Sequence, residues 1–285
     1  MTGAWTIAGY ALQEAIRRKV FAVVLVLTVV FIGLFWLGTD EAFETTAGLG
    51  PDDQTGVDVD VLAGATLFGL AMFGTLFLGT VLAVFLTLGA VRGDAERGLL
   101  QPLVVRPLGR STLLLARFLA AATVCAVYVL IVYAITMFVV WAVGGWSPDE
   151  VVRPGLQLAA AVVLLAALSL LGSVLFSATA NGIAIFMLFG AGLIAGLLGQ
   201  IGEAISSETL IDVAERASWA LPFEALYQDG LYRITADTVG FTRFAVTLGP
   251  FGGAQPAGAL LPLWAVTYLA LIGLAAVGLF ARKDL

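Results

Sequence analysis

The residues best placed to do chemistry lie in one strongly charged segment, residues 91–117, between two long apolar runs. Its acids, Asp94 and Glu96, stand beside Arg97 and Gly98. Apolar residues follow with helical spacing, which predicts a short helix with one apolar strip in charged surroundings. Such a helix suits insertion into a groove on a protein partner, although it can also lie flat on a membrane surface. The strip consists of Leu99, Leu100, Leu103 and Val104.

The composition argues against catalysis by this chain. There is no histidine, and Cys125 is the only cysteine, which excludes His-ligated metals, Ser-His and Cys-His nucleophilic pairs and disulfides. A phosphate-binding loop needs G-x-x-x-x-G-K-[ST], but the only lysines are Lys19 and Lys283. Gly-Arg-Ser at residues 109–111 imitates the end of that pattern, yet Val104 stands where its first glycine belongs. We therefore expect no catalytic residue, no bound cofactor and no metal site.

The elements that must position the charged segment are membrane helices. The chain is 60% hydrophobic and 12% charged, with a mean hydropathy of +1.02. Apolar runs of about 18 residues or more predict transmembrane helices. The middles of these runs hold no charged residue, which argues against an ion-coupled carrier and an intramembrane hydrolase. We predict an all-α membrane protein forming one domain over residues 1–285, with six spans at about 20–38, 61–91, 113–145, 155–179, 183–201 and 259–281.

The basic residues predict how these spans are oriented. Lys and Arg accumulate in short cytoplasmic segments beside span ends. Ten of the 14 basic residues lie in the N-terminal leader, in residues 91–117 or in the C-terminal tail, which predicts cytoplasmic termini. The opposite face is acidic, either for solubility or, as the lesser alternative, as a vestibule that attracts cations. The residues expected to anchor the chain at the cytoplasmic surface are Arg17, Arg18, Lys19, Arg106, Arg110, Arg117, Arg282 and Lys283; Arg92 and Arg97 complete the ten.

Two segments outside the apolar runs, and two patterns of small residues within them, carry further predictions. Residues 1–19 form a basic amphipathic pattern, expected as a helix in the membrane interface or simply as a solvated leader. Residues 202–258 are expected on the extracellular side, with short helices at about 207–219 and 223–233 separated by Pro222. A serine stripe and a G-x-x-x-G pattern are interpreted as helix packing rather than a substrate path. Their residues are Ser169, Ser173 and Ser177, and Gly192 and Gly196.

The charged segment resembles the signature of ABC-2 type permeases. In D-A-E-R-G-L-L-Q-P-L-V-V-R-P-L-G-R-S-T-L-L-L-A-R, Glu96 and Gly98 match the acid and glycine of that signature, and Pro107 and Arg110 match a P-x-x-R element. The basic leader, A-L-P-F-E-A-L-Y and the ending F-A-R-K-D-L are similar to the same family, so the resemblance covers essentially the whole chain. Within the family the chain resembles the six-span permeases that include the one serving nitrous-oxide-reductase maturation. The departures are Leu99, where the family often has threonine, and Arg117, where it often has lysine.

This resemblance implies a permease subunit in the plasma membrane, paired with a second permease subunit as a homodimer or heterodimer. Each subunit would sit on a separate ABC ATP-binding subunit, which uses the ATP, and export is the usual direction. Residues 202–258 would supply re-entrant or gate helices, and no nucleic-acid partner is expected. The alternative is a membrane channel or scaffold without a motor. Within a coupling region at 92–112, the residues expected to contact the ATPase are Asp94, Glu96, Arg97, Gly98, Leu99, Leu100, Leu103 and Val104.

Overall fold

A computed structural model describes residues 19–46, 58–88, 110–236, 238 and 255–282. In these ranges the chain is helical and contains no strand. Six of the described helices are long and apolar enough to cross a membrane, which confirms the predicted fold class. They are α2 (Lys19–Thr46), α3 (Val59–Thr87), α6 (Arg110–Gly144), α7 (Val152–Leu175), α8 (Ala178–Ala204) and α12 (Leu261–Ala281).

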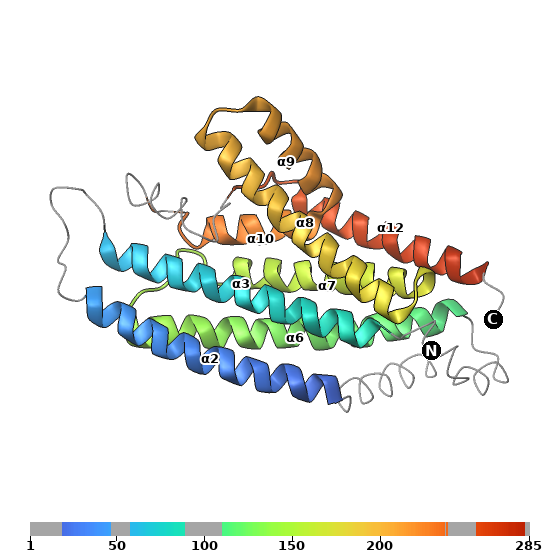
Figure 1. Cartoon of the computed structure of the whole chain (residues 1–285), viewed down its shortest axis with the longest axis horizontal. Coiled ribbons are helices and arrows are strands. Elements are labelled where there is room, and N and C mark those ends of the chain that lie inside the picture. The colour runs from blue at the N-terminus through green and yellow to red at the C-terminus, as the bar shows by residue number, and fades with distance from the viewer. Residues whose placement is uncertain (1–18, 47–57, 89–109, 237, 239–254, 283–285) are drawn as a thin grey trace.

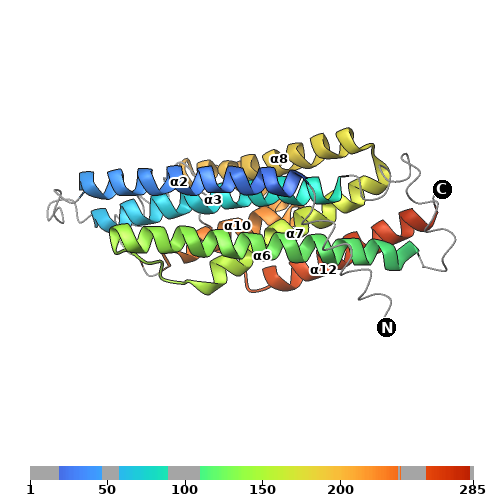
Figure 2. The ribbon, with the colours of Figure 1, turned by 90° about the horizontal axis from the view of Figure 1, so that it is seen from below.

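Helix α7 lies at the centre of the bundle. It packs against α3, α6, α8 and α12, and 72% of the residues in its most apolar 18-residue stretch are buried inside the molecule. Helices α2, α3 and α6 run alongside it (Figures 1 and 2). In the most apolar 18-residue stretch of α2 only 17% of the residues are buried inside the molecule. Val26, Val29 and Leu34 are each more than half exposed. The face of α2 that turns away from the bundle is therefore suited to lipid.

The ends of two helices show why hydropathy locates a span better than it locates a helix. Helix α2 continues to Thr46, past the predicted limit of its span at residue 38, and carries Asp40, Glu41 and Glu44 on the extension. The backbone hydrogen bonds of a helix do not require an apolar side chain, so the helix continues beyond the apolar stretch. Helix α3 begins after Asp58, whose Oδ1 accepts hydrogen bonds from the backbone N–H groups of residues 60 and 61, both at 3.1 Å.

Polar side chains also join the central helices to one another. Thr87 Oγ1 of α3 donates to Ser169 Oγ of α7 at 2.7 Å, and Asn181 Nδ2 of α8 donates to the Ser169 carbonyl at 2.8 Å. Ser173 Oγ donates within α7 to the carbonyl of residue 170, and Ser177 directly precedes α8. For Ser169 and Ser173 these are the interhelical and backbone contacts expected of packing residues in membrane helices.

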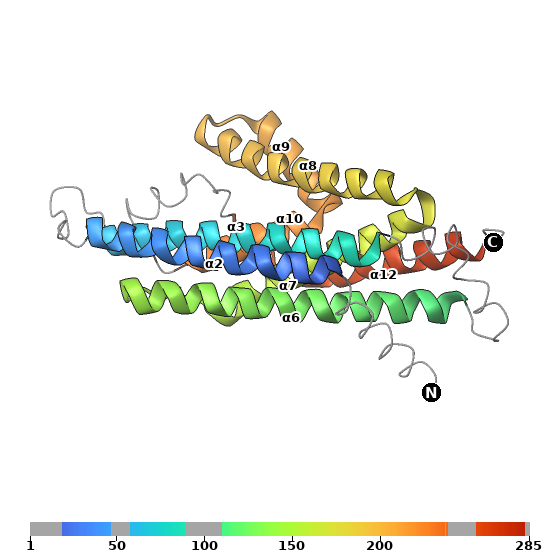
Figure 3. The same cartoon turned by 60° about the horizontal axis from the view of Figure 1, so that its bottom comes forward.

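Two short helices, α9 (Glu208–Ala220) and α10 (Pro222–Arg233), stand between α8 and α12 in the chain. The bundle has an α6–α7 end, where residues 145–151 connect those helices, and an opposite α7–α8 end. Helix α9 folds back along α8 from the α6–α7 end towards the middle of the bundle (Figure 1). Helix α10 then runs back towards the α6–α7 end (Figures 1 and 3). The reversal occurs at Leu221, which has φ −127° and ψ 68°, with proline at the first position of α10. We call α9 and α10 the re-entrant pair, a name that refers only to the reversal of the chain at Leu221.

The two members of the re-entrant pair are placed very differently. Helix α10 packs against α7 as the central spans do, and most of its residues are buried although it is polar. The sequence predicted both helices as parts of the same segment outside the spans, residues 202–258. The interior position of α10 was not predicted, because it depends on contacts with residues far away in the sequence. The buried residues of α10 are Pro222, Phe223, Glu224, Leu226, Tyr227, Gln228, Asp229, Gly230 and Leu231.

Candidate functional site

The residues predicted to couple the chain to an ATPase lie outside the described part of the chain. All eight fall within residues 89–109, so the structure gives them neither a position nor a contact. The amphipathic leader at residues 1–18 also lies outside the described ranges. The eight coupling residues therefore remain a prediction: Asp94, Glu96, Arg97, Gly98, Leu99, Leu100, Leu103 and Val104.

The predicted anchoring residues that are described lie towards one end of the bundle. Lys19 begins α2, Arg110 begins α6 and Arg282 directly follows α12, and these three helix termini lie towards the α7–α8 end (Figure 1). Arg117 lies two turns into α6 and is half-buried. The structure thus brings these basic residues towards one end of the bundle, and the side of the membrane that this end faces stays a prediction. Arg17, Arg18, Arg106 and Lys283 lie outside the described residues.

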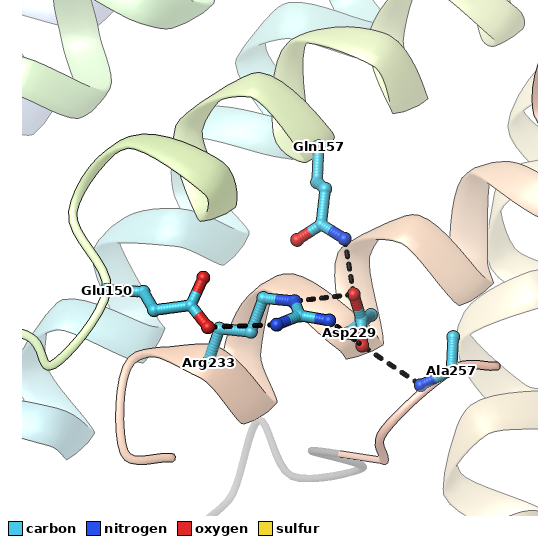
Figure 4. A network of polar contacts seen from close by, with 5 residues as sticks. All are labelled: Glu150, Gln157, Asp229, Arg233 and Ala257. Atoms are coloured by element: carbon cyan, nitrogen blue, oxygen red, sulfur yellow. Dashed lines mark hydrogen bonds and ion pairs between the residues drawn. The ribbon is translucent and has the colours of Figure 1, made fainter. Parts of the chain in front are cut away.

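A buried carboxylate on α10 is the centre of the most connected polar site that the structure describes. Asp229 is 2% exposed, and both of its oxygens accept hydrogen bonds (Figure 4). Oδ2 accepts from Gln157 Nε2 of α7 and from Arg233 Nε at 2.8 Å, while Oδ1 accepts from Arg233 Nη2 at 3.3 Å and from the Ala257 backbone N–H at 3.0 Å. These partners compensate the desolvation of the carboxylate.

The arginine of this site extends the network to the connection between α6 and α7. Arg233 Nη1 donates to Glu150 Oε1 at 2.9 Å, and the backbone N–H of Glu150 donates to the Arg233 carbonyl at 3.3 Å. Partial burial opposes the charged guanidinium, but hydrogen bonds and charges from Asp229 and Glu150 outweigh it and raise the pKa of Arg233. Because the Glu150 side chain is 37% exposed, water screens the outer ion pair more than the inner one. The network thus joins α7, the α6–α7 connection, α10 and the segment before α12.

A second buried pair lies one turn earlier on α10. Gln228 Nε2 donates to Glu224 Oε1 at 2.5 Å, and Glu224 is 3% exposed. Burial raises the pKa of the Glu224 carboxyl to about 7, although the hydrogen bond from Gln228 lowers it. These side chains lie over Gly196 of α8, and the Phe223 ring lies over Gly192. The G-x-x-x-G pattern therefore serves close helix packing within the chain, as interpreted from the sequence.

The sequence contains a local signal for these residues, which were not among the predicted site residues. Glu224 and Gln228, like Asp229 and Arg233, are spaced by four residues, which places each pair on one helical face. Gln157 carries the one amide side chain of the mostly apolar helix α7. The prediction rested on charges in the middles of spans, and neither α10 nor an uncharged amide meets that criterion.

The site has the chemistry of binding and positioning. Its groups are carboxylates, amides and one guanidinium, each held by a neighbour rather than aligned as a nucleophile and base. Among the residues that the structure describes, no three His, Cys, Asp or Glu side chains are grouped to hold a metal ion.

Six spanning helices around a buried polar helix define a multi-pass membrane protein. A sequence model of the ABC-2 family transporter proteins matches residues 5–285, so the chain belongs to this family. The family makes it the membrane-embedded permease subunit of an ABC transporter, which implies an ATP-binding partner subunit. No match was found among curated proteins.

Proposed function

We propose that this permease exports its substrate with energy from ATP hydrolysed on a separate ABC ATP-binding subunit. The observation that carries the proposal is that a chain matched over residues 5–285 by a transporter family lacks the phosphate-loop pattern, since neither Lys19 nor Lys283 lies in one. ATP is then bound by the partner and not by this chain. The resemblance of the coupling segment also supports a place near the nitrous-oxide-reductase maturation permeases.

In this proposal the α7–α8 end and both termini face the cytoplasm, and the α6–α7 end faces outwards across the plasma membrane. The basic residues Lys19, Arg110 and Arg282 at one end support this orientation. Asp40 and Glu44, on the last turns of α2, support it from the other end.

Residues 92–112 then lie on the cytoplasmic side, where the apolar strip of the coupling region enters a groove of the ATP-binding subunit. Two permease subunits, identical or different, assemble with two ATP-binding subunits. ATP-driven closure of the motor pair acts on this segment and switches the interface between the two permease subunits between inward and outward states. These steps follow from the family resemblance of the segment containing Glu96 and Gly98.

The coupling assignment is tested by co-expressing the chain with its candidate ATP-binding subunit. Leu99→Asp combined with Leu103→Asp is expected to abolish co-purification of the ATPase because it places two charges in the apolar strip. Glu96→Lys alone is expected to do the same because it reverses a charge that the resemblance assigns to the ATPase contact. Glu208→Lys, an equal charge reversal at the start of α9, is expected to leave the complex intact because this residue is exposed and does not belong to the predicted coupling region. Retention of the ATPase by the double leucine variant, with normal membrane insertion, would refute the docking assignment.

Direction and energy source are tested in vesicles that contain the reconstituted pair. Export predicts that ATP supplied to the cytoplasmic face drives substrate away from that face. Substrate movement without ATP and without the partner would instead support the channel alternative. A Walker-lysine variant of the partner is the matched control, since it binds the permease but does not hydrolyse ATP.

A further inference from the structure

A cavity lies beside the Glu224–Gln228 pair. It has a volume of about 550 Å³ and is enclosed by α8, the re-entrant pair and the segment that leads into α12. Ligand sites for small molecules commonly have volumes of this order. Helix α8 contributes a wall of small residues, among them Gly192, Gly196 and Gly199, which leaves room for side chains from α10.

The polar groups of the cavity are arranged by depth. Glu203 and Glu215 are exposed and mark its mouth, where Gln255 Nε2 donates to Glu203 Oε1 at 3.0 Å. Glu224 and Gln228 are buried and lie at its floor. Among the described residues that line the cavity there are three glutamates and no lysine or arginine. The cavity therefore favours a cation.

The described arginines nearest this region in the sequence are directed elsewhere. Arg216 of α9 faces Asp212 at 3.9 Å with both side chains exposed, and Arg233 is held by Asp229 and Glu150. None of these five residues lines the cavity. The charge at the floor is therefore not neutralised by either arginine.

An unsatisfied group at the floor indicates a ligand independently of the charge. Gln228 is 6% exposed, and its Oε1 is buried without a hydrogen-bond partner although its Nε2 donates to Glu224. If the amide were turned round, its nitrogen would be left unpaired instead, so one end of Gln228 lacks a partner in either orientation. A buried polar atom without a partner is destabilising, and a ligand N–H would satisfy it.

Aromatic rings provide the apolar side of the cavity. Trp219 and Trp264 both line it, with ring centroids 5.7 Å apart and an interplanar angle of 57°. Trp264 Nε1 donates to the Trp219 carbonyl at 2.9 Å, which fixes the two rings relative to each other. Indole faces attract organic cations and cover apolar groups, so the walls suit a ligand that combines both.

We propose that this cavity binds an amphipathic organic ammonium ion that carries N–H donors. The ammonium group lies between the Glu224 carboxylate and Gln228 Oε1, and the apolar part lies against Trp219 and Trp264. Binding is a property of this chain alone, whereas the claim that such cations are the exported substrates rests on the proposed function.

The test uses the full chain in lipid nanodiscs and the fluorescent primary amine dansylcadaverine. Its N-acetyl derivative is the matched probe, because it keeps the fluorophore and loses the charge. We expect saturable binding of the amine and at least about tenfold weaker binding of the acetylated probe, which cannot form the charge-assisted hydrogen bond. Equal affinity of the two probes would overturn the proposal.

Variants locate the binding site. Glu224→Gln keeps the shape of the side chain and is expected to weaken amine binding about tenfold, while Glu215→Gln at the mouth has a smaller effect. Glu208→Gln removes an exposed acid from the same helix as Glu215 and is expected to bind like wild type because it does not line the cavity. Elution as a single species shows that each variant is folded. Wild-type affinity in folded Glu224→Gln would overturn the assignment.

The pH dependence separates Glu224 from the acids at the mouth. Because burial raises the pKa of Glu224 to about 7, amine binding is expected to strengthen as the pH rises through about 7 and to lose this step in Glu224→Gln. Glu203 of α8 and Glu215 of α9 are the other acids facing the cavity, and the ammonium group of the probe, like that of lysine, stays charged at these pH values. The same rise in amine affinity with pH in wild type and in Glu224→Gln would overturn the assignment.

A final measurement separates this inference from the proposed export. Dansylcadaverine is added to the permease reconstituted with its ATP-binding subunit, and ATP hydrolysis is followed. Stimulation that is lost in Glu224→Gln supports both claims. Binding to the chain without stimulation or ATP-driven movement keeps the binding site but contradicts export of these cations. Export of other compounds by a chain that does not bind the amine contradicts only the binding site.

Discussion

Helices α9 and α10 follow each other in the chain and have similar lengths, 13 and 12 residues, yet they occupy opposite environments. In α9 only Ala214 is buried, and the charged residues Asp212 and Arg216 face outwards. In α10 nine residues are buried, including Glu224 and Asp229. Both helices carry acidic and basic side chains, so charge alone does not decide which of them enters the bundle.

The contrast between α9 and α10 indicates that a polar helix is buried where its polar groups find partners. Asp229 receives four hydrogen bonds from three residues, and two of these residues lie on other elements of the bundle. The corresponding ion pair on α9, between Asp212 and Arg216, is 3.9 Å long and remains in contact with solvent. A pair of that kind contributes little to stability.

Removal of the central carboxylate is expected to have the largest effect on this comparison. Asp229→Ala leaves Gln157 and Arg233 without their shared acceptor inside the bundle. We expect the free energy of unfolding to fall by about 2–4 kcal/mol, below the range for fully buried pairs because Arg233 is partly exposed. Thermal unfolding in detergent measures the loss. An unchanged melting temperature would show that apolar packing alone holds α10.

The next effect concerns pH and Glu224. Its pKa is raised from 4.5 to about 7 in the folded chain, so the folded state retains a proton that the unfolded state releases. The contribution of Glu224 to stability is therefore most favourable below about pH 4.5 and is lost as the pH rises through about 7, by on the order of 2–3 kcal/mol. Melting temperatures across this interval measure the fall. Glu224→Gln is expected to reduce the slope, whereas the exposed Glu208→Gln is expected to retain it.

A smaller effect is expected where α10 meets α8. A Cβ atom added at Gly192 would lie 2.7 and 3.0 Å from atoms of the Phe223 ring, which is fully buried. Gly192→Ala is expected to destabilise the chain by about 1–3 kcal/mol through overpacking. Gly190→Ala on the same helix is the control, since a Cβ there meets nothing within 4 Å. Equal melting temperatures for the two variants would argue against tight packing of α10 on α8.

The smallest effect is expected on α9. Asp212 lies four residues before Arg216, just as Asp229 lies four residues before Arg233, but the side chains of the Asp212–Arg216 pair are exposed. Asp212→Ala therefore removes an acid from an exposed pair with the same spacing. Its melting temperature is expected to match that of wild type, because solvent already screens the interaction. A loss as large as that of Asp229→Ala would remove the contrast between the two helices.

The sequence predicted most of the helices because their signals are local. Long apolar runs located the six spans, and Pro222 separated the two short helices close to the observed break at Leu221. The predicted span limit at residue 38 does not coincide with the end of α2, because residues 40–46 are mostly polar but still helical. Hydropathy reports the solvent around a helix, and the helix continues wherever its backbone bonds do.

The site was less predictable because its contacts join distant parts of the chain. Asp229 is bound by Gln157, which lies 72 residues earlier, and by the backbone of Ala257, which lies 28 residues later. Neither separation produces a periodic pattern. The coupling residues around Glu96 are the converse case, since the sequence singles them out and the described part of the chain does not include them.

The hydrogen bonds at the turn of the re-entrant pair have a consequence for biogenesis. The last carbonyls of α9, those of Trp219 and Ala220, accept hydrogen bonds from Trp264 Nε1 at 2.9 Å and from the Tyr268 hydroxyl at 2.9 Å. Both donors belong to α12, the last of the described helices to leave the ribosome. The pair is therefore incomplete at the translocon until α12 has been made. A nascent chain arrested before residue 255 is expected to expose the polar groups of α10 to membrane quality-control proteases.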